Sequence, residues 1–122
     1  MRPLILELGM GADVHGHDYT KAALRAVSDA IRHSSLSVFQ SHGHPSEMLV
    51  EVTIGVQEPQ KVDRGAVAAA LPYGRVEVAV VKGGLNDTGM GGAEDIVLAV
   101  AGVKAWLDTA AHPFRPDKDA GV

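Results

Sequence analysis

The chain of 122 residues is long enough for one domain with a single hydrophobic core and too short for two. Its formal net charge of −4 argues against a nucleic-acid or anionic-membrane partner, since the 11 Lys and Arg residues form no run. The sequence has no cysteine, which excludes disulfides and leads us to expect a cytoplasmic protein, and no apolar run approaches the roughly 18 residues that a membrane span needs.

The first part of the chain is expected to form a strand and then a helix. Leucines at positions 4, 6 and 8 alternate with Ile5 and Glu7, a pattern typical of a short strand over residues 3–8 rather than of a signal peptide. Asp18 is a good N-cap for a helix that runs to about His33. Apolar residues recur in this helix at helical spacing and give it one buried face: Leu24, Val27 and Ile31.

Four further elements are expected after a polar loop over residues 34–46. Residues 47–56 alternate as a strand, Asp63 can cap a short helix through Leu71, and residues 75–81 alternate as a third strand. A third helix is expected from about 93 to 108, because its apolar residues follow helical spacing: Ile96, Val97, Val100, Val103 and Leu107. The tail, residues 109–122, is expected to be flexible.

These elements predict an α+β fold with the order β-α-β-α-β-α, in which residues 1–108 form a single domain. We expect a two-layer α/β sandwich whose helices cover only the apolar face of the sheet. The opposite face then carries a mixed set of residues that subunit association buries further: Ile5, Glu7, Leu49, Glu51, Thr53, Glu77 and Val81. Aromatic residues make up only 4 % of the chain, so the core is built from small side chains and a homo-oligomer is expected.

A cluster of metal-ligand residue types lies between the first strand and the first helix. Residues 9–18 read G-M-G-A-D-V-H-G-H-D, so Asp13, His15 and His17 occupy every second position. In an extended segment, alternate side chains lie about 7 Å apart on one side, which places His17 about 13 Å from Asp13 unless the backbone bends. Gly16 can supply that bend. Two imidazoles and one carboxylate leave coordination positions open, as in catalytic zinc or facial-triad iron sites.

The same residues also have a purely structural interpretation. Asp18 would cap the helix, while Asp13 and His15 would hydrogen-bond to amides of the turn. A second H-x-H pair, His42 and His44, lies in the longer polar loop and is interpreted as solvated.

Glycine-rich segments raise the question of phosphate binding. The G-M-G at residues 9–11 lacks the third glycine and the helix start of a dinucleotide fingerprint. Residues 88–92 directly precede the expected third helix, so this turn could hold an anionic group through Thr88, Gly89, Met90 and Gly91. A simple tight turn is the alternative, because Glu94 and Asp95 already complement the dipole of that helix.

Two resemblances follow from these motifs. Residues 9–16 resemble the G-x-G-x-D-x-H-G signature of a family of small conserved hypothetical proteins without an assigned function. The resemblance runs to about residue 107 and includes E-V-T-I-G-V at residues 51–56 and L-P-Y-G-R-V at residues 71–76. It implies a family but no chemistry.

The chain is also similar, more distantly, to the methylerythritol cyclodiphosphate synthases, which are trimeric enzymes of isoprenoid precursor synthesis. Asp13 and His15 match the D-x-H of that family, and His17 stands where its third zinc ligand precedes a helix reading A-V-x-D-A-L. The resemblance implies a zinc site on these three residues, a homotrimer, and a two-layer fold like that of the synthase and of Bacillus chorismate mutase.

Other segments extend this second resemblance or depart from it. Gln57 and Lys61 lie in a stretch that resembles the family's A-Q-A-P-K segment, which implies contacts with a nucleotide base. Residues 88–91 resemble its F-T-G-R-G turn. Residues 80–83 read V-V-K-G in place of the T-T-T-E that handles phosphate and a second metal. The fold and the metal position therefore carry over better than the cyclase reaction.

Two functions follow as hypotheses. The first is a small metal-dependent enzyme, a lyase or hydrolase acting on a small anionic metabolite, in which zinc or a similar ion activates water or polarises an oxygen. Asp18 and Lys21 are secondary candidates for proton transfer or charge stabilisation. The rival is a non-catalytic oligomeric protein that binds a metabolite, which the missing T-T-T-E segment favours.

Overall fold

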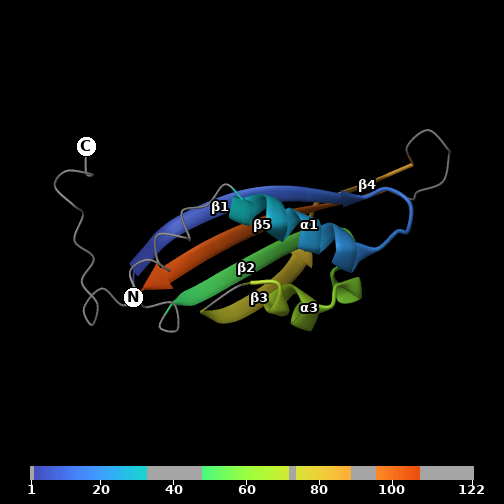
Figure 1. The fold of residues 1–122 in the computed structure, drawn as a ribbon. Coiled ribbons are helices and arrows are strands. Elements are labelled where there is room, and N and C mark those ends of the chain that lie inside the picture. Colours follow the sequence, from blue (N-terminus) through green and yellow to red (C-terminus); the bar gives the residue numbers. More distant parts are fainter. Residues whose placement is uncertain (1, 33–47, 72–73, 89–95, 108–122) are drawn as a thin grey trace, which may run out of the picture.

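The computed structural model describes residues 2–32, 48–71, 74–88 and 96–107. These form a mixed α+β protein with a five-stranded sheet and two α-helices (Figure 1). In chain order the elements are β1 (Arg2–Asp13), α1 (Tyr19–Arg32), β2 (Leu49–Val56), the 3-10 helix η2 (Pro59–Lys61), α3 (Arg64–Ala69), β3 (Arg75–Lys82), β4 (Leu85–Asp87) and β5 (Ile96–Leu107).

The four long strands of the sheet lie in the order β1-β5-β2-β3, and β4 pairs with β5. β5 runs antiparallel to β1 and to β2, while β2 and β3 are parallel to each other. β1, β2 and β3 therefore point in the same direction, and their carboxyl ends lie at the same end of the sheet.

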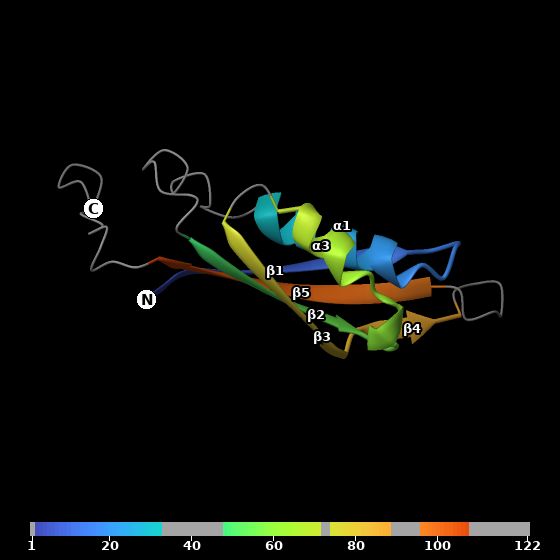
Figure 2. The same cartoon turned by 90° about the horizontal axis from the view of Figure 1, so that it is seen from below.

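Both α-helices lie on one face of the sheet, as Figure 2 shows. Neither described helix is long and apolar enough to span a bilayer. As the composition predicts, the core between the helices and the sheet consists mainly of small aliphatic side chains, including Ala22, Ala23, Ala26, Ala30, Val50, Val52, Ile54, Val97, Val103 and Ala105.

Helix α1 lies directly against the backbone of β1. A Cβ atom at Gly9 would overlap the backbone of Ala26 and Ala30, and one at Gly11 would overlap the backbone of Arg25 and Ala26. Glycine on the strand and alanine on the helix thus let the two backbones approach more closely than larger side chains would allow. The G-M-G segment is a packing motif of this interface.

The first two helices and the three predicted strands are confirmed. Asp18 caps α1 by accepting a hydrogen bond from the amide of Lys21 at 3.0 Å, and Asp63 caps α3 through the amide of Ala66 at 3.1 Å. β1 is longer than predicted, because residues 9–13 continue the strand instead of forming a loop. The expected tail, residues 109–122, lies outside the described residues.

The prediction of a third helix over residues 93–108 is wrong, since residues 96–107 form β5 between β1 and β2. Alternate residues of β5 face the helices and are buried: Val97, Ala99, Ala101, Val103 and Ala105. When a segment is apolar on both faces, its sequence fits the period of a helix as well as the alternation of a strand. The β-branched residues of this segment favour the strand. The described elements therefore end in strands, not in β-α.

The predicted facing of β1 is also wrong. Leu6 and Leu8 were expected on the face covered by the helices, but they are 61 % and 72 % exposed on the open face. The reason is the glycine contact: Gly9 and Gly11 must lie under α1, and alternate residues of a strand share a face. Odd-numbered residues in this part of β1 therefore face the helix, and the leucines face outward.

We expect Gly9→Ala and Gly11→Ala each to lower the free energy of unfolding by about 2–3 kcal/mol, because each added methyl group would overlap helix backbone that cannot move aside cheaply. Urea unfolding followed by circular dichroism measures the effect. Gly102→Ala is the matched control, since its new Cβ atom would lie 3.7 Å from a side-chain carbon of Leu8, an ordinary contact. An equal loss in the control would contradict the role assigned to the interface.

Candidate functional site

Three segments that are distant in sequence meet at the carboxyl end of the sheet. β2 pairs with β5 as far as Val100, and β4 pairs with the next stretch of β5, from Leu98 to Ile96. β4 thus takes the place of β2 at this end, beside the loop that links β1 to α1. Ligands commonly bind outside the carboxyl ends of parallel strands in α/β sheets, which makes this end the natural place to look for a site.

Asp13, the last residue of β1, holds the loop that follows it. Its Oδ2 accepts hydrogen bonds from the amides of Asp18 at 2.8 Å and Gly16 at 3.0 Å. Its Oδ1 lies 3.9 Å from Lys21 Nζ and 3.9 Å from Arg25 Nη1. The pKa of Asp13 lies below its usual value, chiefly because the amide of Asp18 donates a hydrogen bond to the carboxylate. The amide of Gly16 and the two cations lower this pKa further, whereas burial raises it.

The backbone bend in this loop lies at His17, where φ is 51°, and not at Gly16 as expected. A non-glycine residue in this left-handed region costs free energy and persists only where its surroundings fix it. Here the imidazole is fixed by Tyr19: His17 Nε2 lies 3.2 Å from the hydroxyl oxygen, and the two rings meet edge to face at 5.3 Å. Gly16 instead gives room to Asp13, since its Cβ would lie 3.1 Å from Oδ2.

The three predicted metal ligands are not gathered around one point. Asp13 is turned to the loop amides, His17 is turned to Tyr19, and His15 is exposed. Among the described residues, no three His, Asp or Glu side chains lie close enough to hold an ion together. The residues in this arrangement do not fit a zinc ion, and the metal site on Asp13, His15 and His17 stays a prediction.

A second polar cluster is centred on the hydroxyl group of Tyr19, the first residue of α1. The hydroxyl donates to Glu58 Oε2 at 2.8 Å and accepts from Asn86 Nδ2 at 2.6 Å. His17 Nε2 is the third partner of this oxygen. In the tautomer with its proton on Nε2, the imidazole donates to the hydroxyl group, which then donates one hydrogen bond and accepts two. This single oxygen therefore links the loop, α1, the segment after β2, and β4.

Glu58 is the charged member of the Tyr19 cluster. The hydroxyl of Tyr19 lowers its pKa most, followed by Lys61, whose Nζ lies 3.2 Å from Oε1, while burial acts in the opposite direction. Lys61 Nζ also lies 5.7 Å from the centre of the Tyr19 ring, within range of a cation–π contact. The buried Oδ1 of Asn86 has no hydrogen-bond partner within the described segments.

The remaining predicted ligand-binding residues have local contacts. Gln57 donates to the carbonyl oxygens of Gly83 at 3.0 Å and Gly84 at 3.3 Å, which fixes the turn between β3 and β4. Thr88 is exposed, and its amide binds Asp87 Oδ1 at 2.8 Å. The other predicted residues, Gly89, Met90, Gly91, His42 and His44, lie outside the described residues. Ligand binding by Gln57, Lys61 and Thr88 stays a prediction.

The sequence analysis missed four residues that shape this end of the sheet: Tyr19, Arg25, Glu58 and Asn86. None belongs to a spacing motif: Tyr19 and Arg25 lie in α1, Glu58 follows β2, and Asn86 lies in β4. One signal was present for Tyr19, which directly follows the N-cap of the helix. A tyrosine that packs beneath a helix usually needs a hydrogen-bond partner for its hydroxyl group, so one of the few aromatic residues in this chain was a candidate centre for a polar cluster.

The fold and the site define a small α+β protein with a polar centre at the carboxyl end of its sheet. The chain belongs to the Lin0512 family of conserved hypothetical proteins, whose model matches residues 3–105. The function of this family is uncharacterised, so membership supplies no reaction.

The chain is also similar to a solved structure. The chain is 36 % identical to an FtsZ-like protein of unknown function from Nostoc punctiforme, with a TM-score of 0.78, and the match covers 88 % of this chain and 96 % of that one. A comparison with curated proteins found no match.

The lowered pKa of Asp13 predicts acid lability. The ionised carboxylate stabilises the folded protein fully above its ordinary pKa of 3.8, and this contribution is lost as the pH falls through the lower pKa of the folded state. We expect the unfolding free energy of the wild type to fall below about pH 4, and to fall less steeply in Asp13→Asn. Urea titrations at a series of pH values measure both slopes, and equal slopes would contradict the assignment.

Tyr19→Phe should lower the free energy of unfolding by about 1–3 kcal/mol, because it leaves the buried amide of Asn86 and the carboxylate of Glu58 without their shared partner. A double-mutant cycle with Glu58→Gln, measured by urea unfolding, isolates the coupling. Additive effects of the two substitutions would show that the phenol does not link these residues.

Proposed function

We propose that the protein binds a small anionic metabolite in a pocket of about 340 Å³ at the start of α1. The pocket lies beside the carboxyl end of β1 and is lined by Asp13, Val14, His15, Gly16, Asp18, Lys21 and Arg25. Its volume is at the lower end of the roughly 300–1,000 Å³ typical of ligand sites, which suits a compact ligand with one or two charged groups.

The observation that carries this proposal is the sharing of one carboxylate oxygen by two cations. Lys21 Nζ and Arg25 Nη1 both lie 3.9 Å from Oδ1 of Asp13, whose other oxygen is already occupied by backbone amides. The side chains of Lys21 and Arg25 remain 53 % and 49 % exposed, so neither is enclosed by its contact with Asp13. An ammonium and a guanidinium that face the same point are suited to bind a carboxylate or phosphate group.

The surrounding groups agree with an anionic ligand. The pocket adjoins the amino end of α1, where the helix dipole adds partial positive charge, although Asp18 offsets part of it as the N-cap. Arg25 also donates to the carbonyl oxygen of Ala12, which aims its guanidinium along the edge of β1 toward the pocket. The loop and helix thus hold both cations in place before a ligand arrives, which lowers the entropic cost of binding.

The metal-dependent enzyme remains the second candidate, because Asp13 and His15 line the same pocket. For an ion to bind there, His17 would have to leave Tyr19, and the carboxylate of Asp13 would have to exchange amide hydrogen bonds for the ion. A bound ion would supply Lewis-acid chemistry toward an anionic substrate. The homotrimer and the synthase-like fold implied by the sequence resemblance belong to this candidate.

Isothermal titration with inorganic pyrophosphate tests the binding site. We expect binding by the untagged wild type, at least about tenfold weaker binding by Lys21→Gln and by Arg25→Gln, and weaker binding at high salt. Arg64→Gln removes an exposed cation on α3 outside the pocket and should bind as the wild type does.

Failure of the wild type to bind pyrophosphate, or equal affinity in all variants, would overturn the proposal. Metal analysis of the same untagged preparation separates the two candidates. Near-stoichiometric zinc, lost in Asp13→Ala, would support the enzyme instead.

A further inference from the structure

The open face of the sheet, the one that no helix covers, carries a group of exposed apolar side chains. Large aliphatic side chains on this face are 38–72 % exposed, namely Leu6, Leu8, Met10, Val81 and Val100. They come from three different strands, so the exposure is a property of the face and not of one edge. Contiguous apolar surface on this scale marks an interaction site in most soluble proteins.

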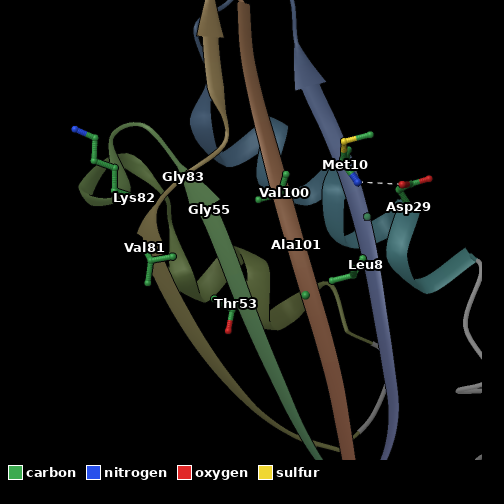
Figure 3. A pocket seen from close by; sticks show the side chains of 12 residues that line it. Leu8, Met10, Asp29, Thr53, Gly55, Val81, Lys82, Gly83, Val100 and Ala101 are labelled. Carbon is green, nitrogen blue, oxygen red and sulfur yellow. Dashed lines mark hydrogen bonds between the residues drawn. The ribbon is translucent and has the colours of Figure 1, made fainter.

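The face has a ridge and a trough side by side. Leu8 and Met10 project from β1, and next to them lies a cavity of about 640 Å³, shown in Figure 3. Its floor is shallow because each neighbouring strand contributes a glycine: Gly102 of β5 is in register with Thr53, and Gly55 of β2 is in register with Val100. A surface with both a ridge and a trough can complement itself when two copies meet about a two-fold axis.

The charges at one end of the face are also self-complementary. Glu51 and Glu77 lie directly opposite each other on β2 and β3, an arrangement that is unfavourable for two like charges. On the same face, Lys104 is in register with Glu51, and Arg75 precedes Glu77 by two residues. A second copy facing this row can place a lysine or arginine near the two glutamates and relieve their repulsion.

Growth of the sheet at the exposed edge of β1 is a poor alternative. Side chains of α1 already occupy backbone groups there: the amide of Met10 donates to Asp29 Oδ2 at 3.0 Å, and Arg25 donates to the carbonyl oxygen of Ala12. A strand added at this part of the edge would have to displace both contacts. The open face therefore offers an easier contact than the edge.

The open face is large enough for a stable interface. Four strands about 4.8 Å apart, with 8 to 12 residues each at about 3.3 Å per residue, cover roughly 600 Å² before the relief of the side chains is counted. Stable interfaces bury about 600–1,000 Å² on each partner. A second copy stacked on the whole face therefore reaches the lower end of this range.

We propose that a second copy of this chain covers the open face, sheet against sheet, with the Leu8 and Met10 ridge of each copy in the trough of the other. The two sheets lie about 10 Å apart, as in stacked sheets generally. The anion-binding pocket at the start of α1 lies on the opposite layer, so the contact does not depend on that proposed function.

Analytical ultracentrifugation over a concentration series tests the contact. The wild type should sediment with twice the mass of one 12.7 kDa chain. Leu8→Glu should sediment as a single chain with an unchanged circular dichroism spectrum, because Leu8 is 72 % exposed and outside the core. Val14→Glu is the matched control, since Val14 is apolar and 44 % exposed but lies in the loop after β1.

A monomeric wild type, or an oligomer that persists in Leu8→Glu, overturns the proposal. A covalent test does not depend on that variant, since the chain has no cysteine. Oxidation of a double variant, Met10→Cys with Thr53→Cys, should give a covalent dimer, because the ridge of one copy then meets the trough of the other, while β5 keeps the two positions of one chain about 10 Å apart. Val14→Cys with Thr53→Cys should not give a covalent dimer. An assembly of three chains would also overturn the proposal, because a contact in which each copy's ridge fills the other's trough closes at two copies.

Discussion

The contact between Gly9 and Gly11 of β1 and the alanine face of α1 is the constraint on which the rest of the structure depends. It brings two backbones together without intervening side chains, so it tolerates no slip of the helix along the strand. A shift of one residue on the strand would replace glycine by Met10 under the helix. The position of α1 along β1 is therefore set by the two glycines, which have no Cβ atom, rather than by the amount of apolar area that is buried.

This register places the functional groups. With α1 fixed on β1, its first turn lies at the carboxyl end of the strand, where Asp13 binds the amides of the loop and faces Lys21 and Arg25. The same register brings the hydroxyl of Tyr19 to Glu58, at the end of β2. It also turns Leu6 and Leu8 away from the helices, so one packing contact decides both where polar groups gather and which face of the sheet no helix covers.

The sequence allowed much of the fold to be predicted, and the errors have definite causes. α1 and α3 could be predicted because Asp18 and Asp63 are local capping signals that act within one turn. The sequence of β5 predicts a helix because it is apolar on both faces, and periodicity cannot distinguish a helix from a strand in such a segment. The spacing of Asp13, His15 and His17 predicts possible metal ligands but not the directions of their side chains, since His17 turns toward a tyrosine hydroxyl that no spacing rule anticipates.

By itself, the sequence determined the local features: the strands with one mixed face, the helix caps, the small side chains of the core, and the family to which the chain belongs. These depend on interactions between residues a few positions apart, or on composition. Only the tertiary structure decided that β4 replaces β2 beside β5, that Asn86 meets Tyr19 across 67 residues of chain, and that Leu8 faces outward. Those outcomes depend on which backbones can approach each other, and that is a property of the packed chain as a whole.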